Sequence, residues 1–218
     1  MATKATRPEG GEKVLAPAGT HQARVYRFMN LGTRLQQYQG VDKDYKDTLI
    51  NITWELPNEL HEFTKKNADG TETTEKKPIV VSREFTLSMG SKSNLRPIVE
   101  GIIGTTLTDD EAYEFDLESL VGMASLVTIN HKESSKGNTY AKLVSTAPLI
   151  KGMEAPEAVN KPEIFDVKTA TKEEIEALPT FLKDKIFVSD EFKARFKAAT
   201  SNKVDSPQEE INPDDIPF

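Results

Sequence analysis

The stretch Thr48–Leu56, TLINITWEL, decides the fold class of this chain. Its side chains alternate along the segment, with Ile50, Ile52, Trp54 and Leu56 on one face and Asn51, Thr53 and Glu55 on the other. A period of two is typical of a half-buried β-strand. Pro57 ends the pattern because proline cannot donate to a strand ladder. We therefore expect a core built on a sheet.

Segments on both sides of this strand continue the β pattern. Strands are predicted at His21–Asn30, Ile79–Ser88, Ala124–Lys132 and Tyr140–Ala147. The last two are joined at residues 134–138, Ser-Ser-Lys-Gly-Asn, a tight hairpin signal. The polar stretches 32–40 and 58–77 contain Gly32, Gly40 and Gly70 and are interpreted as loops.

Short helices interrupt the strands. Apolar residues from Leu95 to Ile103 recur at spacings of three and four and predict an amphipathic helix ended by Gly104, with Pro97 in its first turn. A further helical turn is expected at 116–121, with Asp116 as its N-cap. The order is strand, strand, strand, helix, strand, strand, which is that of the five-stranded OB-fold barrel.

The chain divides by composition into four parts. We expect a flexible arm at residues 1–17, an OB-fold body at 18–150, a Pro-containing strap with short helices at 151–200, and a disordered acidic tail at 201–218. The appendage is predicted to hold two helices, at 171–178, opened by the capping box Thr171 and Glu174, and at 190–199. The fold class is therefore mainly β, with a small helical C-terminal appendage.

Charge and composition narrow the class of protein. The absence of cysteine excludes disulfides, thiolate metal sites and cysteine nucleophiles. No apolar run is long enough to span a membrane, so no membrane partner and a cytoplasmic location are expected. The net charge of -7 is uneven: residues 1–150 have 18 basic and 20 acidic residues, whereas 151–218 have 10 and 15. A nearly neutral body of this kind can still carry a basic face.

The last residues, Asp214-Asp215-Ile216-Pro217-Phe218, form the most specific motif. They resemble the C-terminal tip of the bacterial single-stranded DNA-binding protein family, in which aspartates precede Ile-Pro-Phe. Phe218 combines an aromatic ring with the terminal carboxylate, which suits an apolar pocket rimmed by Arg or Lys. The resemblance implies that Asp214, Asp215, Ile216, Pro217 and Phe218 bind replication, recombination or repair proteins. The alternative is a tail that only confers solubility.

The body resembles the single-stranded DNA-binding proteins encoded by tailed bacteriophages. The resemblance covers roughly residues 14–150 and rests on Gly19-Thr20-His21, Asn30-Leu31-Gly32 and Trp54-Glu55-Leu56. It implies that the chain binds and protects single-stranded DNA in replication, recombination or repair. A phage origin would place the protein in the cytoplasm of a bacterial host.

Binding a strand regardless of its sequence requires cations along the phosphates and aromatic faces for the bases. Alternation places Arg24 with Tyr26 on the first strand and Tyr140 with Lys142 on the last. The candidate DNA-binding residues are Arg24, Tyr26, Arg34, Tyr38, Trp54, His131, Lys132, Lys136, Tyr140 and Lys142. Tyr26 equally suits the barrel core. Trp54 lies in register with Ile50 and Ile52 and suits the core better than a stacking role, and Lys132 and Lys136 also suit a solvated turn.

Other functions are less well supported by the residues. Asp109, Asp110 and Glu111 could belong to the magnesium site of a nuclease, but an acidic first helical turn is the commoner meaning of such a run. We expect no enzyme activity, no catalytic residue, no metal and no cofactor. A recombination mediator or strand-annealing adaptor with the same tail remains an alternative, and a homo-oligomer is compatible with the sequence.

Overall fold

The computed structural model describes residues 14–38, 41–66, 71–134 and 137–197. The chain forms two compact units, the first from Met1–Asn30 with Thr48–Phe165 and the second from Leu31–Asp47 with Asp166–Phe218. The strands are β1 (Gly19–Tyr38), β2 (Val41–Lys66), β3 (Glu72–Thr86), β4 (Ala124–Glu133), β5 (Thr139–Ala147) and β6 (Glu163–Asp166). The helices are α1 (Arg96–Ile103), α2 (Asp109–Glu114), the 3-10 turn η1 (Leu117–Leu120), α3 (Lys172–Ala177), α4 (Thr180–Phe187), α5 (Asp190–Phe192) and the π-helical turn η2 (Lys193–Lys197).

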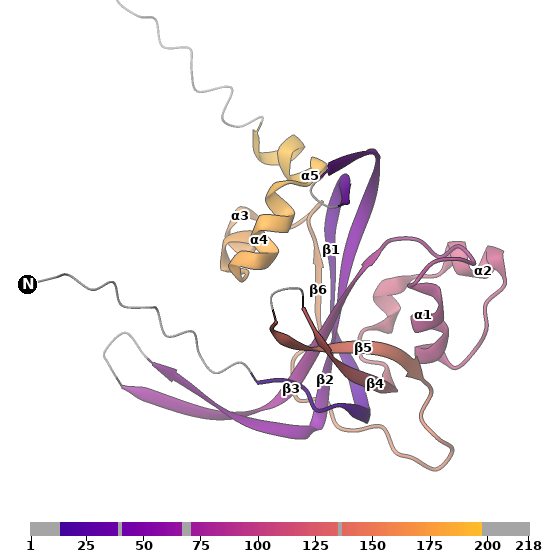
Figure 1. The fold of residues 1–218 in the computed structure, drawn as a ribbon, viewed down its shortest axis with the longest axis vertical. Coiled ribbons are helices and arrows are strands. Elements are labelled where there is room, and N and C mark those ends of the chain that lie inside the picture. The colour runs from indigo at the N-terminus through magenta and orange to yellow at the C-terminus, as the bar shows by residue number, and fades with distance from the viewer. Residues whose placement is uncertain (1–13, 39–40, 67–70, 135–136, 198–218) are drawn as a thin grey trace, which may run out of the picture. The chain divides into compact units, whose positions relative to one another are not determined.

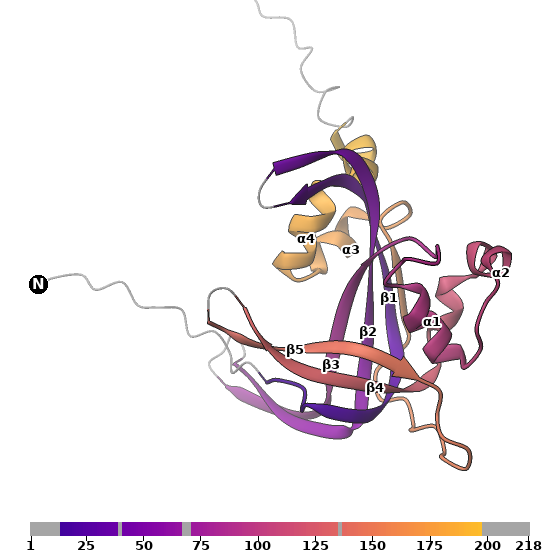
Figure 2. The ribbon, with the colours of Figure 1, turned by 45° about the vertical axis from the view of Figure 1, so that its right-hand side comes forward.

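The first unit is a curled antiparallel half-barrel (Figures 1 and 2). Its strands lie in the order β3-β2-β1-β4-β5, and β6 pairs with β1 outside this path. Strands β3 and β5, at the two ends of the path, approach each other where Arg83 donates to the carbonyls of Leu143 and Val144, each at 3.2 Å. This strand order, with α1 between β3 and β4, is the one expected of an OB-fold. The mainly β fold with short helices is thus confirmed.

The core forms where the alternating strands turn their apolar faces inward. The predicted inner face of β2 is buried, with Ile50, Ile52, Trp54 and Leu56 all fully shielded. Helix α1 packs across β5, where Thr146 Oγ1 donates to the carbonyl of Ile98 at 2.7 Å. A Cβ on Gly101 would lie only 2.4 Å from the Thr146 carbonyl oxygen, so the close packing needs glycine there.

Several elements follow the sequence predictions closely. Helix α1 ends at Gly104, which has a φ of 73°, and Pro97 lies in its first turn. Asp116 caps η1, and Thr171 and Glu174 form the capping box of α3. Ser134 and Asn138 close the β4–β5 hairpin through a backbone hydrogen bond of 2.9 Å.

The two predicted loops were wrong over most of their length. Residues 31–38 continue β1, and β2 and β3 extend as a paired ribbon to Lys66 and from Glu72. The ribbon pairs His61 with Lys77, and the hydroxyls of Thr64 and Thr74 lie 3.2 Å apart. Because a two-stranded ribbon buries neither face, its sequence lacks the apolar alternation that reveals a strand. Strand β6 and helix α4 were also missed.

Candidate nucleic-acid interface

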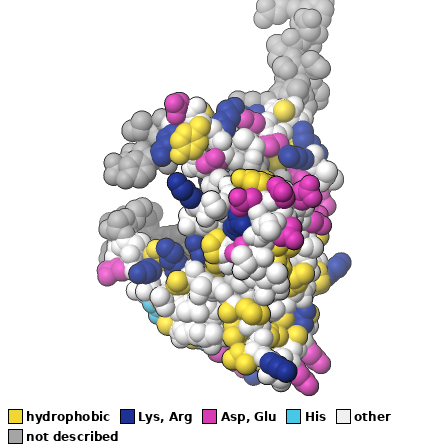
Figure 3. All heavy atoms as spheres, turned by 90° about the vertical axis from the view of Figure 1, so that its right-hand side faces the viewer, with side chains coloured by type: hydrophobic (Ala, Val, Ile, Leu, Met, Phe, Trp, Pro, Cys, Tyr) yellow, Lys and Arg dark blue, Asp and Glu magenta, His cyan; other side chains and the backbone are white. Residues whose placement is uncertain are grey.

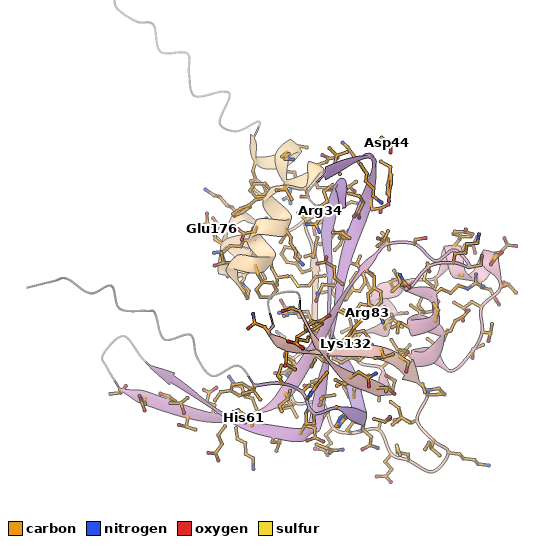
Figure 4. The ribbon with its side chains drawn as sticks, in the orientation of Figure 1. Arg34, Asp44, His61, Arg83, Lys132 and Glu176 are labelled. Carbon is orange, nitrogen blue, oxygen red and sulfur yellow. The ribbon has the colours of Figure 1, made fainter. Side chains whose placement is uncertain are left out.

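The outward face of the β4–β5 hairpin gathers part of the predicted binding set. Lys132 lies directly opposite Tyr140, and Asn130 lies opposite Lys142. Val127 and Ile129 point into the core, so the alternation of β4 turns Asn130 and Lys132 outward. Figure 4 labels Lys132 on this hairpin. We call Asn130, Lys132, Tyr140 and Lys142 the hairpin face.

The hairpin face combines two ammonium groups with one exposed ring. Tyr140 is 41% exposed, and both lysines are exposed. None of these three side chains forms a hydrogen bond or ion pair with another residue that the structure describes. The nearest hairpin acid, Glu133, lies opposite Thr139 on the other face with His131. The described part of this face therefore carries positive charge and an aromatic surface without a compensating carboxylate.

The strap, defined here as residues 148–162, covers the outer face of β1. The Arg24 guanidinium donates to the carbonyl of Pro156 at 2.7 Å from Nη2 and 3.2 Å from Nε, and to the carbonyl of Gly122. Gln22 donates to the carbonyl of Glu154 at 3.3 Å. Arg24 lies on the outer face of β1, and its guanidinium donors are used to hold the strap.

A buried carboxylate fastens the strap to β2. Glu55 has no exposed surface and accepts three hydrogen bonds, from the backbone N–H groups of Val159 at 3.0 Å and Asn160 at 2.7 Å and from the Asn160 side-chain amide at 2.7 Å. Hydrogen bonds to a charged group are each worth about 1.5–3 kcal/mol. Glu55, which the alternation turned away from the core, therefore anchors the strap.

The remaining predicted residues lie apart from the hairpin face. Trp54 is fully buried and cannot stack on a base in this conformation, so its role is that of the core alternative. Tyr26 is half-buried, and burial raises the pKa of its hydroxyl although Arg27 lies 5.6 Å from its ring centroid and opposes the shift. His131 Nε2 lies 2.9 Å from the carbonyl of Ala16.

Three further predictions fall outside the first unit or outside the described atoms. Arg34 lies on the part of β1 that belongs to the second unit. Tyr38 is the last residue of β1, but its side chain lies outside the described part of the structure, as does the whole of Lys136. The tip residues Asp214, Asp215, Ile216, Pro217 and Phe218 also lie outside the described residues.

A contrasting acidic surface lies on α1 and α2. The sequence has no Lys or Arg between Arg96 and Lys132. Figure 3 looks onto the side that carries α1 and α2 and shows acidic side chains gathered there. Asp109 pairs with Arg96, and Glu111 completes the capping box of α2 with Thr108. Hydrogen bonds from Thr108 lower the pKa of Glu111. The interpretation of these acids as a charged first helical turn is confirmed.

The ribbon formed by β2 and β3 was not predicted from the sequence as a possible binding surface. Phe63, 38% exposed, lines a pocket of about 550 Å³ with Pro78, Val80 and Asn160. His61 packs edge-on against Phe63, with ring centroids 5.0 Å apart. The alternation of His61 and Phe63 was the available signal. The ribbon lysines are accompanied by acids, and Lys77 is paired with Glu75.

Comparison of the chain with protein-family models and with curated proteins gave no match. None of the helices described is long and apolar enough to cross a membrane. Within the described ranges, no three His, Asp or Glu side chains are grouped so that they could hold a metal ion.

Proposed function

We propose that this protein binds single-stranded DNA on the hairpin face of its first unit. The observation that carries the proposal is the cross-strand pair Lys132–Tyr140 with Lys142 beside it, all exposed and without a partner among the described residues. An ammonium group attracts the phosphates, and a tyrosine ring accepts any base on its face. The curled half-barrel supports the proposal because small barrels of this order are frequent carriers of strand-binding surfaces.

The same chemistry favours a single strand over a duplex. A duplex keeps its bases stacked on each other, so Tyr140 could not engage them, whereas an open strand offers every base face. Stacking needs no base-specific hydrogen bonds, so binding is expected to tolerate any sequence. It should weaken steeply with salt because phosphate contacts release counterions.

A binding assay with paired charge reversals tests this proposal. Lys132→Glu with Lys142→Glu should weaken the binding of a fluorescent dT oligonucleotide and make the plot of log K against log salt shallower by about 1.4, or about 0.7 for each phosphate that is no longer neutralised. Lys92→Glu with Lys151→Glu changes the net charge equally at two other exposed lysines of the first unit. An equal loss of affinity in both double variants would mean that net charge alone governs binding and would overturn the assignment.

The role of the C-terminal tip in recruiting proteins is proposed from its sequence motif alone. Phe218→Ala removes the aromatic ring, so oligonucleotide binding should be unchanged while tip-dependent partners from a bacterial lysate are no longer recovered. Asp205→Asn serves as the control, because it lies in the same tail away from the tip. Equal recovery of partners by wild type and Phe218→Ala would refute the role of the tip.

A further inference from the structure

The second unit contains a junction that brings α5 against β1. Gly32 has a φ of 87°, and a Cβ placed there would lie 2.7 Å from both the Ser189 Cβ and a carboxylate oxygen of Glu191. Ser189 is buried and caps α5 by accepting from the backbone N–H of Phe192 at 3.2 Å. Only glycine fits both the backbone conformation and the close approach.

Glu191 fastens this junction. Its carboxylate accepts from the backbone N–H of Thr33 at 2.7 Å and from the Thr33 hydroxyl at 2.9 Å. The carboxylate of Glu191 is thereby directed at the backbone of β1. These two hydrogen bonds hold α5 against β1.

The junction positions a pocket of about 430 Å³ within the second unit. Its lining residues are Arg34, Leu35, Gln36, Lys46, Val188, Asp190 and Lys193. Three of them are cationic and one is acidic. Lys46 pairs with that acid, Asp190, at 2.7 Å, and cations outnumber acids among the lining residues that the structure describes. Figure 4 labels Arg34, which comes from β1.

We infer that this pocket takes a phosphate group of a nucleic-acid strand through Arg34, Lys46 and Lys193. A guanidinium offers a planar fork of donors that matches phosphate oxygens, and ammonium groups add charge without directional demand. Leu35 and Val188 are 44% and 47% exposed and give the pocket an apolar wall for the sugar or base attached to the phosphate. The amide of Gln36 adds a hydrogen-bonding group to the lining.

The inference rests on the proposed function and extends it, because it gives the second unit a strand contact of its own. The apolar wall favours a nucleotide of a strand over inorganic phosphate, which would use only the cations.

A titration of the ¹⁵N-labelled full chain followed by NMR tests the inference without any substitution. A dT oligonucleotide should shift the amide signals of Arg34, Gln36, Lys46 and Lys193. Shifts confined to the hairpin face would overturn this inference and leave the proposed function intact. Saturation of the pocket signals by sodium pyrophosphate, or by a peptide of residues 205–218, but not by the oligonucleotide would assign the pocket to another anion and also overturn it.

Substitutions then measure the contribution of the pocket. Arg34→Glu with Lys193→Glu should make the salt dependence of oligonucleotide binding shallower by about 1.4, from about 0.7 per phosphate neutralised. Lys172→Glu with Lys183→Glu, on α3 and α4 of the same unit, should leave it unchanged. An unchanged slope in the first pair would contradict the inference. Absence of any oligonucleotide binding by the wild-type chain would instead remove the proposed function.

Discussion

Tyr140 and Tyr113 show why exposure alone does not mark a binding residue. Tyr113, on α2, is 70% exposed and Tyr140 is 41% exposed. Tyr113 is surrounded in sequence by acids and lies in the stretch without Lys or Arg, whereas Tyr140 lies opposite Lys132. A phosphate next to Tyr113 would be repelled, and one next to Tyr140 would be attracted. The charge of the neighbours therefore decides which ring can receive a base.

Tyr140→Ala should weaken oligonucleotide binding by about 1–3 kcal/mol, the usual contribution of one base stacked on an aromatic ring. Tyr140→Phe keeps the ring and should bind as the wild type does, and Tyr113→Ala provides the control at a more exposed tyrosine. Fluorescence anisotropy with a labelled oligonucleotide measures all three. If Tyr140→Ala and Tyr113→Ala had equal effects, stacking at Tyr140 would be excluded as the source of affinity.

For single residues, the alternation of side chains along a strand predicted which of them face outward and which face the core. It placed Tyr140 with Lys142 on an outward face and turned Trp54 inward with Ile50 and Ile52. It could not show that Arg24 is occupied, because its acceptors, Gly122 and Pro156, lie far away in the sequence. A side chain that binds a distant backbone carbonyl leaves no local pattern in the sequence. The sequence therefore could not separate Arg24, whose donors are used within the protein, from the lysines of the hairpin face.

Most elements that bury an apolar face were predicted, and the exposed ribbon was not. Two short elements, α4 with buried Leu182 and Ile186 and β6 with buried Phe165, were missed although they pack inward. The strands around the core have apolar alternation, and α1 has its Pro97 start and Gly104 end. The β2–β3 ribbon is largely exposed, with charged and Thr residues on both strands, and apart from the alternation of His61 and Phe63 its sequence resembles that of a loop. Backbone pairing, which any residue except proline can provide, holds the ribbon together.

The junction of α5 with β1 is expected to make the stability of the second unit depend on pH. Burial alone would raise the pKa of the Glu191 carboxyl, but hydrogen bonds from Thr33 and from the Glu191 backbone N–H, together with the charge of Lys168, outweigh it and the pKa is lowered. A carboxyl with a lowered pKa in the folded state stabilises the fold above its unfolded pKa, and the stabilisation is lost as the pH falls through the folded value. The second unit should therefore lose stability as the pH falls below the ordinary range for glutamate.

Glu191→Gln isolates this effect because glutamine does not titrate. Thermal unfolding of wild type and variant should differ most at neutral pH, and the difference should shrink as the solution is acidified. Glu173→Gln, at an exposed position of α3, is the matched control. A difference between wild type and Glu191→Gln that stayed constant with pH would contradict the assigned role of the carboxylate.

For the whole molecule, the total charge is a poor guide to the partner. The net charge is -7, yet one face of the first unit has exposed lysines and no acid among its described hairpin residues. The acids concentrate in the segment from Glu100 to Glu118 and after residue 150. The strand order was predictable from the succession of elements. The division into two units was not, because residues 31–47 join helices that follow more than a hundred residues later.

Photocrosslinking tests the central claim most directly. An oligonucleotide carrying bromodeoxyuridine is bound to the full chain at low salt and irradiated, and the crosslinked tryptic peptides are identified by mass spectrometry. The account predicts a crosslink within Gly137–Lys142, the peptide that contains Tyr140. Efficient crosslinking that spares this peptide and falls on other parts of the chain would contradict it.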